Sequence, residues 1–305
     1  MSENNSDSNS YENENEVSDE ENNQNQNNNS ITSNLYKQSK SVKFSNEKEN
    51  KQEITKSSDP HDDSYDSEKD PVSVIIFDSE INFLTDIEYV DIVFVIDTTN
   101  SMSPYFKGIK RFIRKLINDA KKSLSHYKNT NVDMLKIGIV GYKDHNNNND
   151  SYYSSLKKSN KNDNNYVSKI LCDLTGDNNE FKESLFQIKC NGGGDEAEAV
   201  LDGLNLATNG IKWREKSLKY IYHVCDKPPH GSELNGNVND DYKNGCPCGL
   251  THKEILEEIR CKYIEYTVIM LDSCLENMIE AFSKYSKIDV MQPDIKKDKN
   301  ISGKQ

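Results

Sequence analysis

The residues best suited to chemistry in this sequence are three oxygen-bearing side chains at alternating positions, Asp97, Thr99 and Ser101. One carboxylate and two hydroxyls are hard oxygen donors, which suit Mg²⁺ better than a soft metal. Alternate residues of a tight loop can converge on one point, so this spacing permits all three to bind the same ion. A hydrophobic run, residues 92–96, precedes them directly, and a segment with helical periodicity follows them.

The apolar run Ile92–Ile96 has no polar alternation, which is typical of a parallel strand covered on both faces. After the loop, apolar residues recur at helical spacing at Phe106, Ile109, Ile113, Leu116, Ile117 and Ala120. The three oxygen donors therefore stand on a strand-to-helix loop at the carboxyl end of a sheet, where open α/β folds bind their ligands. Helix capping by Ser101 or Ser103 is the alternative explanation, but it leaves the carboxylate at position 97 unexplained.

Strands and helices alternate along the rest of the folded part. We predict strands at 134–142, 166–174, 219–225, 264–271 and 288–291, and helices at 178–188, 196–207, 251–261 and 276–285. This alternation indicates βαβ units. The predicted fold class is α/β, with a doubly wound, mostly parallel sheet flanked by helices.

Composition divides the 305 residues into a folded part and polar segments. Residues 1–70 are dominated by Asn, Ser, Glu and Asp without apolar periodicity, so we expect a disordered arm. The low-complexity run 146–165 is expected to be a loop within the folded part. We predict one domain over residues 88–290, large enough for a single core, and a flexible tail at 291–305.

The net charge of −13 argues against non-specific binding to nucleic acid or to a membrane surface, since both need a positive field. The first residues lack the layout of a signal peptide, and no apolar stretch approaches membrane-spanning length. Seven cysteines scattered through predicted strands and helices favour reduced thiols. We therefore expect a cytoplasmic protein, and the sequence leaves its oligomeric state open.

Two further loops at the same predicted edge carry acidic side chains. The glycine turn 191–194 leads into Asp195 and Glu196, and the strand at 219–225 ends at Asp226. Each has an ordinary explanation, because acids in a first helical turn complement the helix dipole and an Asp after a strand is often a turn residue. Oxygen ligands on three loops at one edge of a sheet are, however, what a discontinuous metal site requires.

The loop at 97–101 resembles the metal-ion-dependent adhesion site of von Willebrand factor A (VWA) domains, written Asp-x-Ser-x-Ser, with Thr99 keeping the first hydroxyl. The chain is similar in particular to the VWA domain of the intracellular alpha-kinase group. This resemblance covers about residues 88–290 and is carried by segments 97–102, 142–145, 192–200, 223–231 and 240–250. Nothing after residue 290 is long enough for a kinase domain, so we expect no kinase activity from this polypeptide.

In that family a Thr from a middle loop and an Asp from a later loop complete the site. Asp226 matches the later Asp, whereas Gly194 followed by Asp195 stands where the family has Thr. We assign Asp195 as the substitute ligand, with Glu196 as the fallback. The added carboxylate should raise metal affinity and weaken the attraction of the metal for an acidic partner. The resemblance thus implies Mg²⁺, or else Mn²⁺ or Ca²⁺, bound by Asp97, Thr99, Ser101, Asp195 and Asp226.

The expected function is a non-enzymatic interaction module. An open coordination position on the metal would accept a carboxylate from a partner protein, and the surrounding loops would select the partner. Two alternatives remain: a regulatory or targeting component of an alpha-kinase system, and a scaffold that binds no metal.

The segment Cys246-Pro-Cys248 raises the question of a zinc site, with further potential ligands at His223, Cys225 and His230. Its cysteines are closer together than in the usual zinc pair, and no second pair completes a tetrahedral set. We therefore favour packing of a loop across the metal edge. The pair Asp144-His145 suggests acid–base chemistry, but no nucleophile can be assigned to it, and a solvated loop is favoured.

Overall fold

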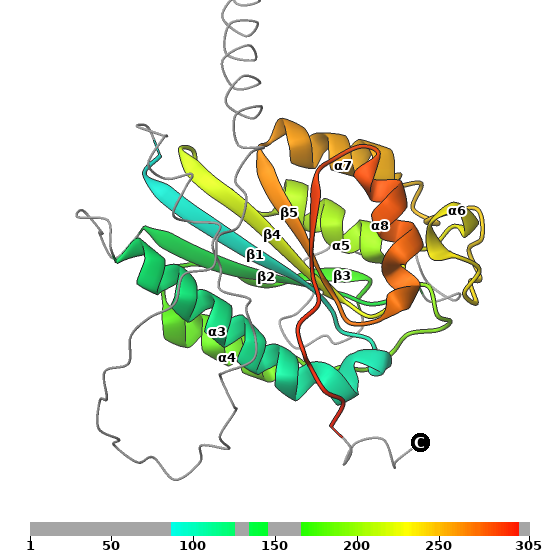
Figure 1. Cartoon of the computed structure of the whole chain (residues 1–305), viewed down its shortest axis with the longest axis horizontal. Coiled ribbons are helices and arrows are strands. Elements are labelled where there is room, and N and C mark those ends of the chain that lie inside the picture. Colours follow the sequence, from blue (N-terminus) through cyan, green and yellow to red (C-terminus); the bar gives the residue numbers. More distant parts are fainter. Residues whose placement is uncertain (1–86, 126–133, 146–165, 299–305) are drawn as a thin grey trace, which may run out of the picture. The chain divides into compact units, whose positions relative to one another are not determined.

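The structure is a computed structural model that describes residues 87–125, 134–145 and 166–298 (Figure 1). The predicted disordered arm (1–70) and the predicted inserted loop (146–165) lie outside the described residues. Among the helices of the described part, none combines the length and apolar character needed to cross a membrane.

Six strands of the described chain form one sheet in the order β3-β2-β1-β4-β5-β6. All neighbouring strands are parallel except β2 and β3. The prediction of a doubly wound, mostly parallel sheet is confirmed. The strands are β1 (Tyr89–Asp97), β2 (Leu135–Tyr142), β3 (Ser168–Thr175), β4 (Ser217–Cys225), β5 (Ile264–Met270) and β6 (Ile288–Met291). Strand order reverses about β1, and ligands of open α/β sheets bind beside such a switch point.

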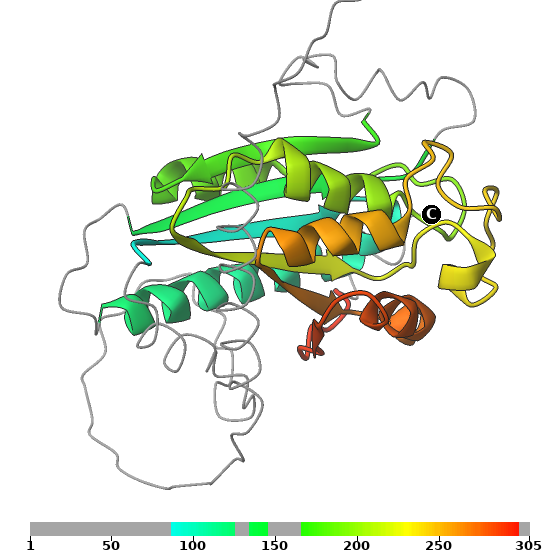
Figure 2. The same cartoon turned by 90° about the horizontal axis from the view of Figure 1, so that it is seen from above.

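Helices cover both faces of the sheet (Figures 1 and 2). One face packs against α3 (Phe106–Leu124) and α4 (Asn178–Gln187), and the other packs against α5 (Val200–Asn205), α7 (His252–Cys261) and α8 (Glu276–Ser283). Alternate residues of β1 enter the two cores, with Phe94 in the first and Val93 and Val95 in the second. Burial on both faces explains why β1 is continuously apolar. Shorter elements are η2 (Asn100–Tyr105), η4 (Leu206–Gly210), α6 (Ser232–Asn235) and η5 (Ser273–Leu275).

Helix α5 begins at Val200, four residues later than the predicted start at position 196. Residues 196–199 are held by neighbouring loops instead. The Glu198 N–H donates to the Pro228 carbonyl at 2.9 Å, and Glu198 forms an isolated parallel bridge with Pro229. The Ala199 N–H donates to the Lys143 carbonyl at 2.8 Å. These bonds fix the path of the backbone between the glycine turn and α5.

Residues 292–298, part of the predicted tail, lie against η2 and the start of α3. The Asp298 N–H donates to the Pro104 carbonyl at 2.8 Å, and the Lys297 Nζ lies 5.1 Å from the centre of the Tyr105 ring. The side chain of Ile295 lies so close to Gly108 that a Cβ there would be 2.6 Å from the Ile295 Cγ2. This segment therefore packs onto the helix that follows the Asp97 loop.

His223, on β4, is a fully buried core residue. Its two ring nitrogens lie 2.8 Å from the hydroxyl oxygens of Tyr142 and Tyr266. Burial lowers the pKa of His223 from 6.5 to about 3. In the unfolded chain the imidazole takes up a proton near its ordinary pKa, whereas in the folded protein it stays neutral to much lower pH. We therefore expect stability to fall as the pH drops through this interval, by about 1.4 kcal/mol per pH unit from this group.

Urea denaturation at several pH values between 6 and 4 measures this effect. The His223→Gln variant cannot take up the proton. Its free energy of unfolding should therefore fall less steeply with decreasing pH than that of the wild type, by about 1.4 kcal/mol per pH unit. Identical slopes for the two proteins would contradict the prediction.

Candidate metal centre

The loop after β1 brings one carboxylate and two hydroxyls together. The Asp97 Oδ1 accepts hydrogen bonds from the Thr99 N–H at 2.8 Å and from the Thr99 hydroxyl at 2.7 Å. The Thr99 Oγ1 lies 3.1 Å from the Ser101 Oγ. Asp97 and Thr99 are fully buried. Alternate residues of the loop thus converge as the spacing predicts.

Helix capping does not account for these hydroxyls. Thr99 precedes η2, but its side chain makes no capping hydrogen bond. The Ser101 hydroxyl donates instead to the Asp226 Oδ1 at 2.9 Å, across 125 residues of sequence. The Ser103 hydroxyl donates to the Cys190 carbonyl at 3.4 Å. The side chains of Thr99 and Ser101 therefore belong to a long-range polar cluster.

Asp226 reaches this cluster because β4 lies next to β1 in parallel register. Ile96 pairs with Val224, so both strands end at the same edge of the sheet. Asp226 immediately follows β4 and is buried. The structure thus brings together Asp97, Thr99, Ser101 and Asp226, four of the five residues that the sequence predicts as metal ligands.

The glycine turn lies directly against the Asp97 loop. The Asn100 N–H donates to the Gly192 carbonyl and the Asn191 N–H donates to the Thr98 carbonyl, both at 3.0 Å. Gly193 has φ +97°, and a Cβ at this position would lie 3.5 Å from the Thr99 Cβ and 3.3 Å from the Glu198 Oε1. Glycine therefore permits both the backbone conformation and the close approach of the two loops.

Glu198 is the acid that the middle loop directs toward the Asp97 loop. Its side chain is buried, with only 2% of the residue exposed. Burial and then the charge of Asp97 raise its pKa, and the nearby Thr99 side chain lowers it in part. Among the described residues, no group hydrogen-bonds to the Glu198 Oε2 or to the Asp97 Oδ2, although both atoms are buried. Two buried carboxylate oxygens beside two hydroxyls are thus left available for another ligand.

The electrostatics of this cluster favour a bound cation. Burial, followed by the charge of Asp226, raises the pKa of Asp97 to about 8. Burial, followed by the charges of Asp97 and Asp144, raises the pKa of Glu198 to about 11. Burial also raises the pKa of Asp226. Buried carboxylates that disfavour each other's ionised form are stabilised when a divalent cation lies between them.

Asp195 occupies a different position. Its Oδ1 accepts a hydrogen bond from the Ala197 N–H at 3.0 Å, and its Oδ2 accepts one from the Asp241 N–H. Its carboxylate lies in a group with Asp144 and His230, in which one potential ligand atom of each residue is within 4.8 Å of the others. The fallback residue, Glu196, bonds to Lys227 at 3.1 Å at the surface. The assignment of Asp195 as a ligand of the Asp97 site stays a prediction, and Glu198 is a second candidate for that role.

The imidazole of His230 links the acids next to Asp195. Its Nε2 lies 3.1 Å from the Asp144 Oδ1, and its Nδ1 lies 3.0 Å from the Asp240 Oδ1. Burial alone would lower the pKa of His230, but the carboxylates of Asp144 and Asp240 beside its two ring nitrogens outweigh burial and raise it. Asp144 therefore pairs with His230 rather than with its sequence neighbour His145, so the two do not form the acid–base pair suggested by their adjacency.

The arrangement fits a hard divalent cation. Oxygen donors alone converge at the Asp97 loop, which is the donor chemistry of Mg²⁺, Mn²⁺ and Ca²⁺. The residues placed to hold such an ion are Asp97, Thr99, Ser101, Glu198 and Asp226. Glu198 is absent from the metal ligands predicted from the sequence, because the acidic residues before α5 are interpreted as the first turn of a helix. The period-two alternation of acidic residues with Ala197 and Ala199, both buried in the structure, is the feature of the sequence that could have indicated an extended path.

Comparison with known proteins agrees with this architecture. Residues 87–271 match the family model described as the integrin beta chain VWA domain. Over 181 residues the chain is 30% identical to the alpha-protein kinase vwkA of Dictyostelium discoideum, a match that covers 59% of this chain and 25% of that protein. The chain thus spans about a quarter of the length of this relative.

Two solved structures are among those to which part of the chain is similar. The SpRpn10 VWA domain is 13% identical, with 68% of this chain and 92% of that chain covered and a TM-score of 0.40. Proximal thread matrix protein 1 from the mussel byssus, solved with a zinc-occupied MIDAS motif, is 14% identical, with coverages of 72% and 44% and a TM-score of 0.42. With its family-model match spanning more than half of its length, the chain belongs to the von Willebrand factor A domain family.

Proposed function

We propose that this chain is a non-enzymatic, cytoplasmic interaction module that binds a protein partner through a divalent cation at the Asp97 loop. The cation is Mg²⁺, held by Asp97, Thr99, Ser101 and Asp226, with the fifth ligand from Glu198 or Asp195. The metal supplies positive charge and an open coordination position for an incoming carboxylate. The observation that carries the proposal is the pair of buried carboxylate oxygens without hydrogen-bond partners in the described residues, on Asp97 and Glu198.

The charge of the site bears on the chemistry of the partner. Three carboxylates exceed the charge of one divalent ion, which weakens its attraction for a fourth carboxylate. Two lysines offset part of this excess. Lys143 interacts electrostatically with Asp97 and Glu198, and the charge of Lys227 opposes the burial that raises the pKa of Asp226. A partner carboxylate approaching the metal therefore meets less excess negative charge than the three carboxylates alone would present.

An affinity pull-down with the full chain as bait tests this proposal. The bait is compared in Mg²⁺, in chelator, and as the Asp97→Asn variant in Mg²⁺. We expect at least one partner to be retained by the wild-type bait in Mg²⁺ and lost under the other two conditions. Replacing each Asp and Glu of that partner's binding segment by Asn or Gln should then identify one carboxylate whose loss abolishes binding.

Partners retained equally by the wild-type and Asp97→Asn baits would overturn metal-mediated capture and favour the metal-free scaffold.

The seven cysteines are free thiols in the structure, which agrees with the proposed reducing compartment.

A second candidate function is a regulatory or targeting role in an alpha-kinase system. The similarity to the Dictyostelium alpha-protein kinase favours it. Purified full chain should then bind a separately expressed alpha-kinase catalytic domain and change its activity or location, while neither binding labelled ATP nor phosphorylating a substrate alone. Failure to associate with such a domain would remove this candidate and leave the interaction module intact.

A further inference from the structure

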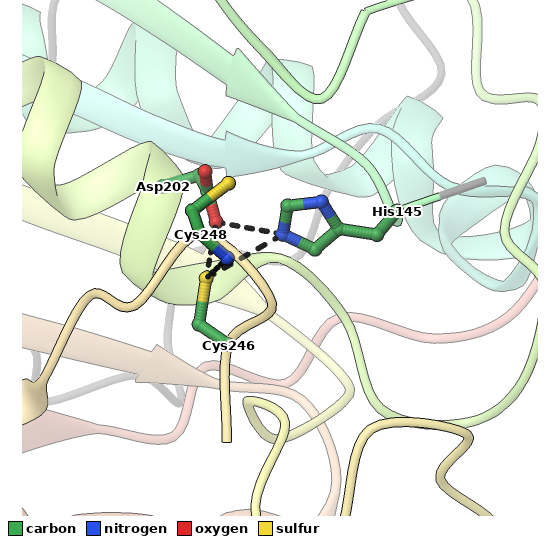
Figure 3. A group of neighbouring side chains, drawn as sticks. All are labelled: His145, Asp202, Cys246 and Cys248. Atoms are coloured by element: carbon green, nitrogen blue, oxygen red, sulfur yellow. Dashed lines mark hydrogen bonds and ion pairs between the residues drawn. The ribbon is translucent and has the colours of Figure 1, made fainter. Parts of the chain in front are cut away.

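A second group of potential metal ligands lies away from the Asp97 loop and does not depend on the proposed function. Figure 3 shows the side chains of His145, Asp202, Cys246 and Cys248 directed toward one another. One ligand atom from each lies within 4.8 Å of all the others. They come from three separate segments: the loop after β2, helix α5, and the loop that precedes α7.

The distances in this group fit a tetrahedral ion. The His145 Nε2 lies 3.0 Å from the Asp202 Oδ2, and the Cys246 Sγ lies 3.2 Å from the same oxygen and 3.6 Å from the same nitrogen. Zinc–ligand bonds of about 2.0–2.3 Å give tetrahedral edges of roughly 3.3–3.8 Å. Small movements of these side chains would therefore place all four atoms around one centre.

The ligand types distinguish this group from the Asp97 loop. Two cysteine sulfurs, one imidazole nitrogen and one carboxylate oxygen are ligands that zinc accepts together, whereas Mg²⁺ requires oxygen. His145, Asp202 and Cys246 are buried, and Cys248 is half-buried. Without a metal, the same atoms form a hydrogen-bonded cluster, with the Cys246 thiol donating to Asp202.

In the sequence, two features disfavour zinc: the cysteines are closer together than in the usual zinc pair, and a second pair of ligands is missing. The structure supplies that pair from distant parts of the chain: Cys246 lies 44 residues from Asp202 and 101 residues from His145. The two other histidine candidates have different neighbours: the ring nitrogens of His223 lie beside two tyrosine hydroxyls in the core, and those of His230 lie beside Asp144 and Asp240.

An ion at this group would hold the connection between β4 and α7 in one conformation. Residues 226–250 form a long connection between β4 and α7 that contains one short helix, α6, and long connections of this kind need specific contacts to hold one conformation. Asp240 organises its first part by accepting hydrogen bonds from the Gly231 N–H at 2.8 Å and the Asn235 amide at 2.7 Å. The second part contacts His145 and Asp202 through its residues Cys246 and Cys248.

We propose that His145, Asp202, Cys246 and Cys248 bind one Zn²⁺ that fastens the 226–250 connection to β2 and α5. Both thiols bind as thiolates and release their protons to solvent, while Asp202 binds as carboxylate and His145 as neutral imidazole. The ion thereby fixes the loop whose Asp241 N–H donates a hydrogen bond to the Asp195 carboxylate.

Metal analysis of the purified full chain, produced in zinc-supplemented medium, tests this site. We expect about one equivalent of zinc per chain, lost in Cys246→Ser and in Cys248→Ser. Cys261→Ser is the matched control, because Cys261 is a free, exposed cysteine at the end of α7 and should leave the zinc in place. The Asp97→Asn variant should also keep its zinc, which separates this ion from any zinc held by oxygen ligands at the Asp97 loop.

Two measurements on the wild-type protein cover the case in which the cysteine variants fail to fold. Replacement of zinc by Co²⁺ should give sulfur-to-metal charge-transfer bands and the intense visible bands of a tetrahedral site. Titration of the thiols with an organomercurial should release zinc in step with the reaction of two cysteines. Absence of zinc from the wild-type protein, its loss in Asp97→Asn, or its retention in both Cys246→Ser and Cys248→Ser would overturn the proposal.

Discussion

Replacing Asp97 by Asn is expected to weaken Mg²⁺ binding by at least about 100-fold, because loss of even an outer-shell partner of a metal site costs about 10–100-fold. Asp97 lies at the centre of the polar cluster and is completely buried. The amide keeps the oxygen that accepts from Thr99 but removes the charge. Calorimetric titration of the full chain with Mg²⁺ and Mn²⁺ measures the change. Equal heats from the two proteins would contradict a metal site at this loop.

The same titration decides which acid of the middle loop completes the site. Glu198 lies against Thr99 with an oxygen that no described residue hydrogen-bonds, whereas both oxygens of Asp195 accept backbone hydrogen bonds. Glu198→Gln should therefore weaken Mg²⁺ binding by about 10-fold or more, and Asp195→Asn by clearly less. The reverse order would restore Asp195 as the fifth ligand. Thermal unfolding of each metal-free variant shows whether the fold is retained.

The largest expected effect on stability follows from replacing Arg214 by Met. The Arg214 guanidinium lies 2.6 and 2.7 Å from the Asp91 Oδ1 through two nitrogens and also donates to the Val90 and Met134 carbonyls. Asp91 is fully buried on β1, so the substitution leaves an unpaired charge in the core. We expect a loss of about 3–5 kcal/mol of unfolding free energy.

Urea denaturation at neutral pH measures this loss. Lys216→Met is a matched control, because Lys216 forms an ion pair with Glu88 at 2.7 Å and both side chains are at least half exposed. A pair exposed to solvent contributes little, so the control should unfold close to the wild-type urea concentration. Similar midpoints for Arg214→Met and Lys216→Met would show that the buried pair does not anchor β1.

The features that could be predicted from sequence are those with a local cause. The apolar run before Asp97 predicts a strand because a central parallel strand is buried on both sides. Asp97 and Asp226 come together because each follows a strand of one parallel sheet, and parallel strands bring their carboxyl ends to the same edge. The all-oxygen donor set then follows from residue types alone.

The features that could not be predicted depend on the path of the backbone between elements. Helical periodicity does not reveal that residues 196–199 bond to neighbouring loops, so the sequence places the start of the helix four residues too early and does not single out Glu198. The group of potential zinc ligands around Cys246 could not be predicted for the same reason. Its other ligands lie on a loop and a helix whose proximity only the tertiary fold creates.

The backbone bonds of the middle loop have a mechanical consequence. This loop is hydrogen-bonded to the Asp97 loop through Asn100 and Thr98, to the loop that contains Asp226 through Pro228, and to the end of β2 through Lys143. A force applied to any one of these segments is therefore shared by the others. A partner held at this edge should therefore detach under tension in a single abrupt step, rather than by peeling away one contact after another.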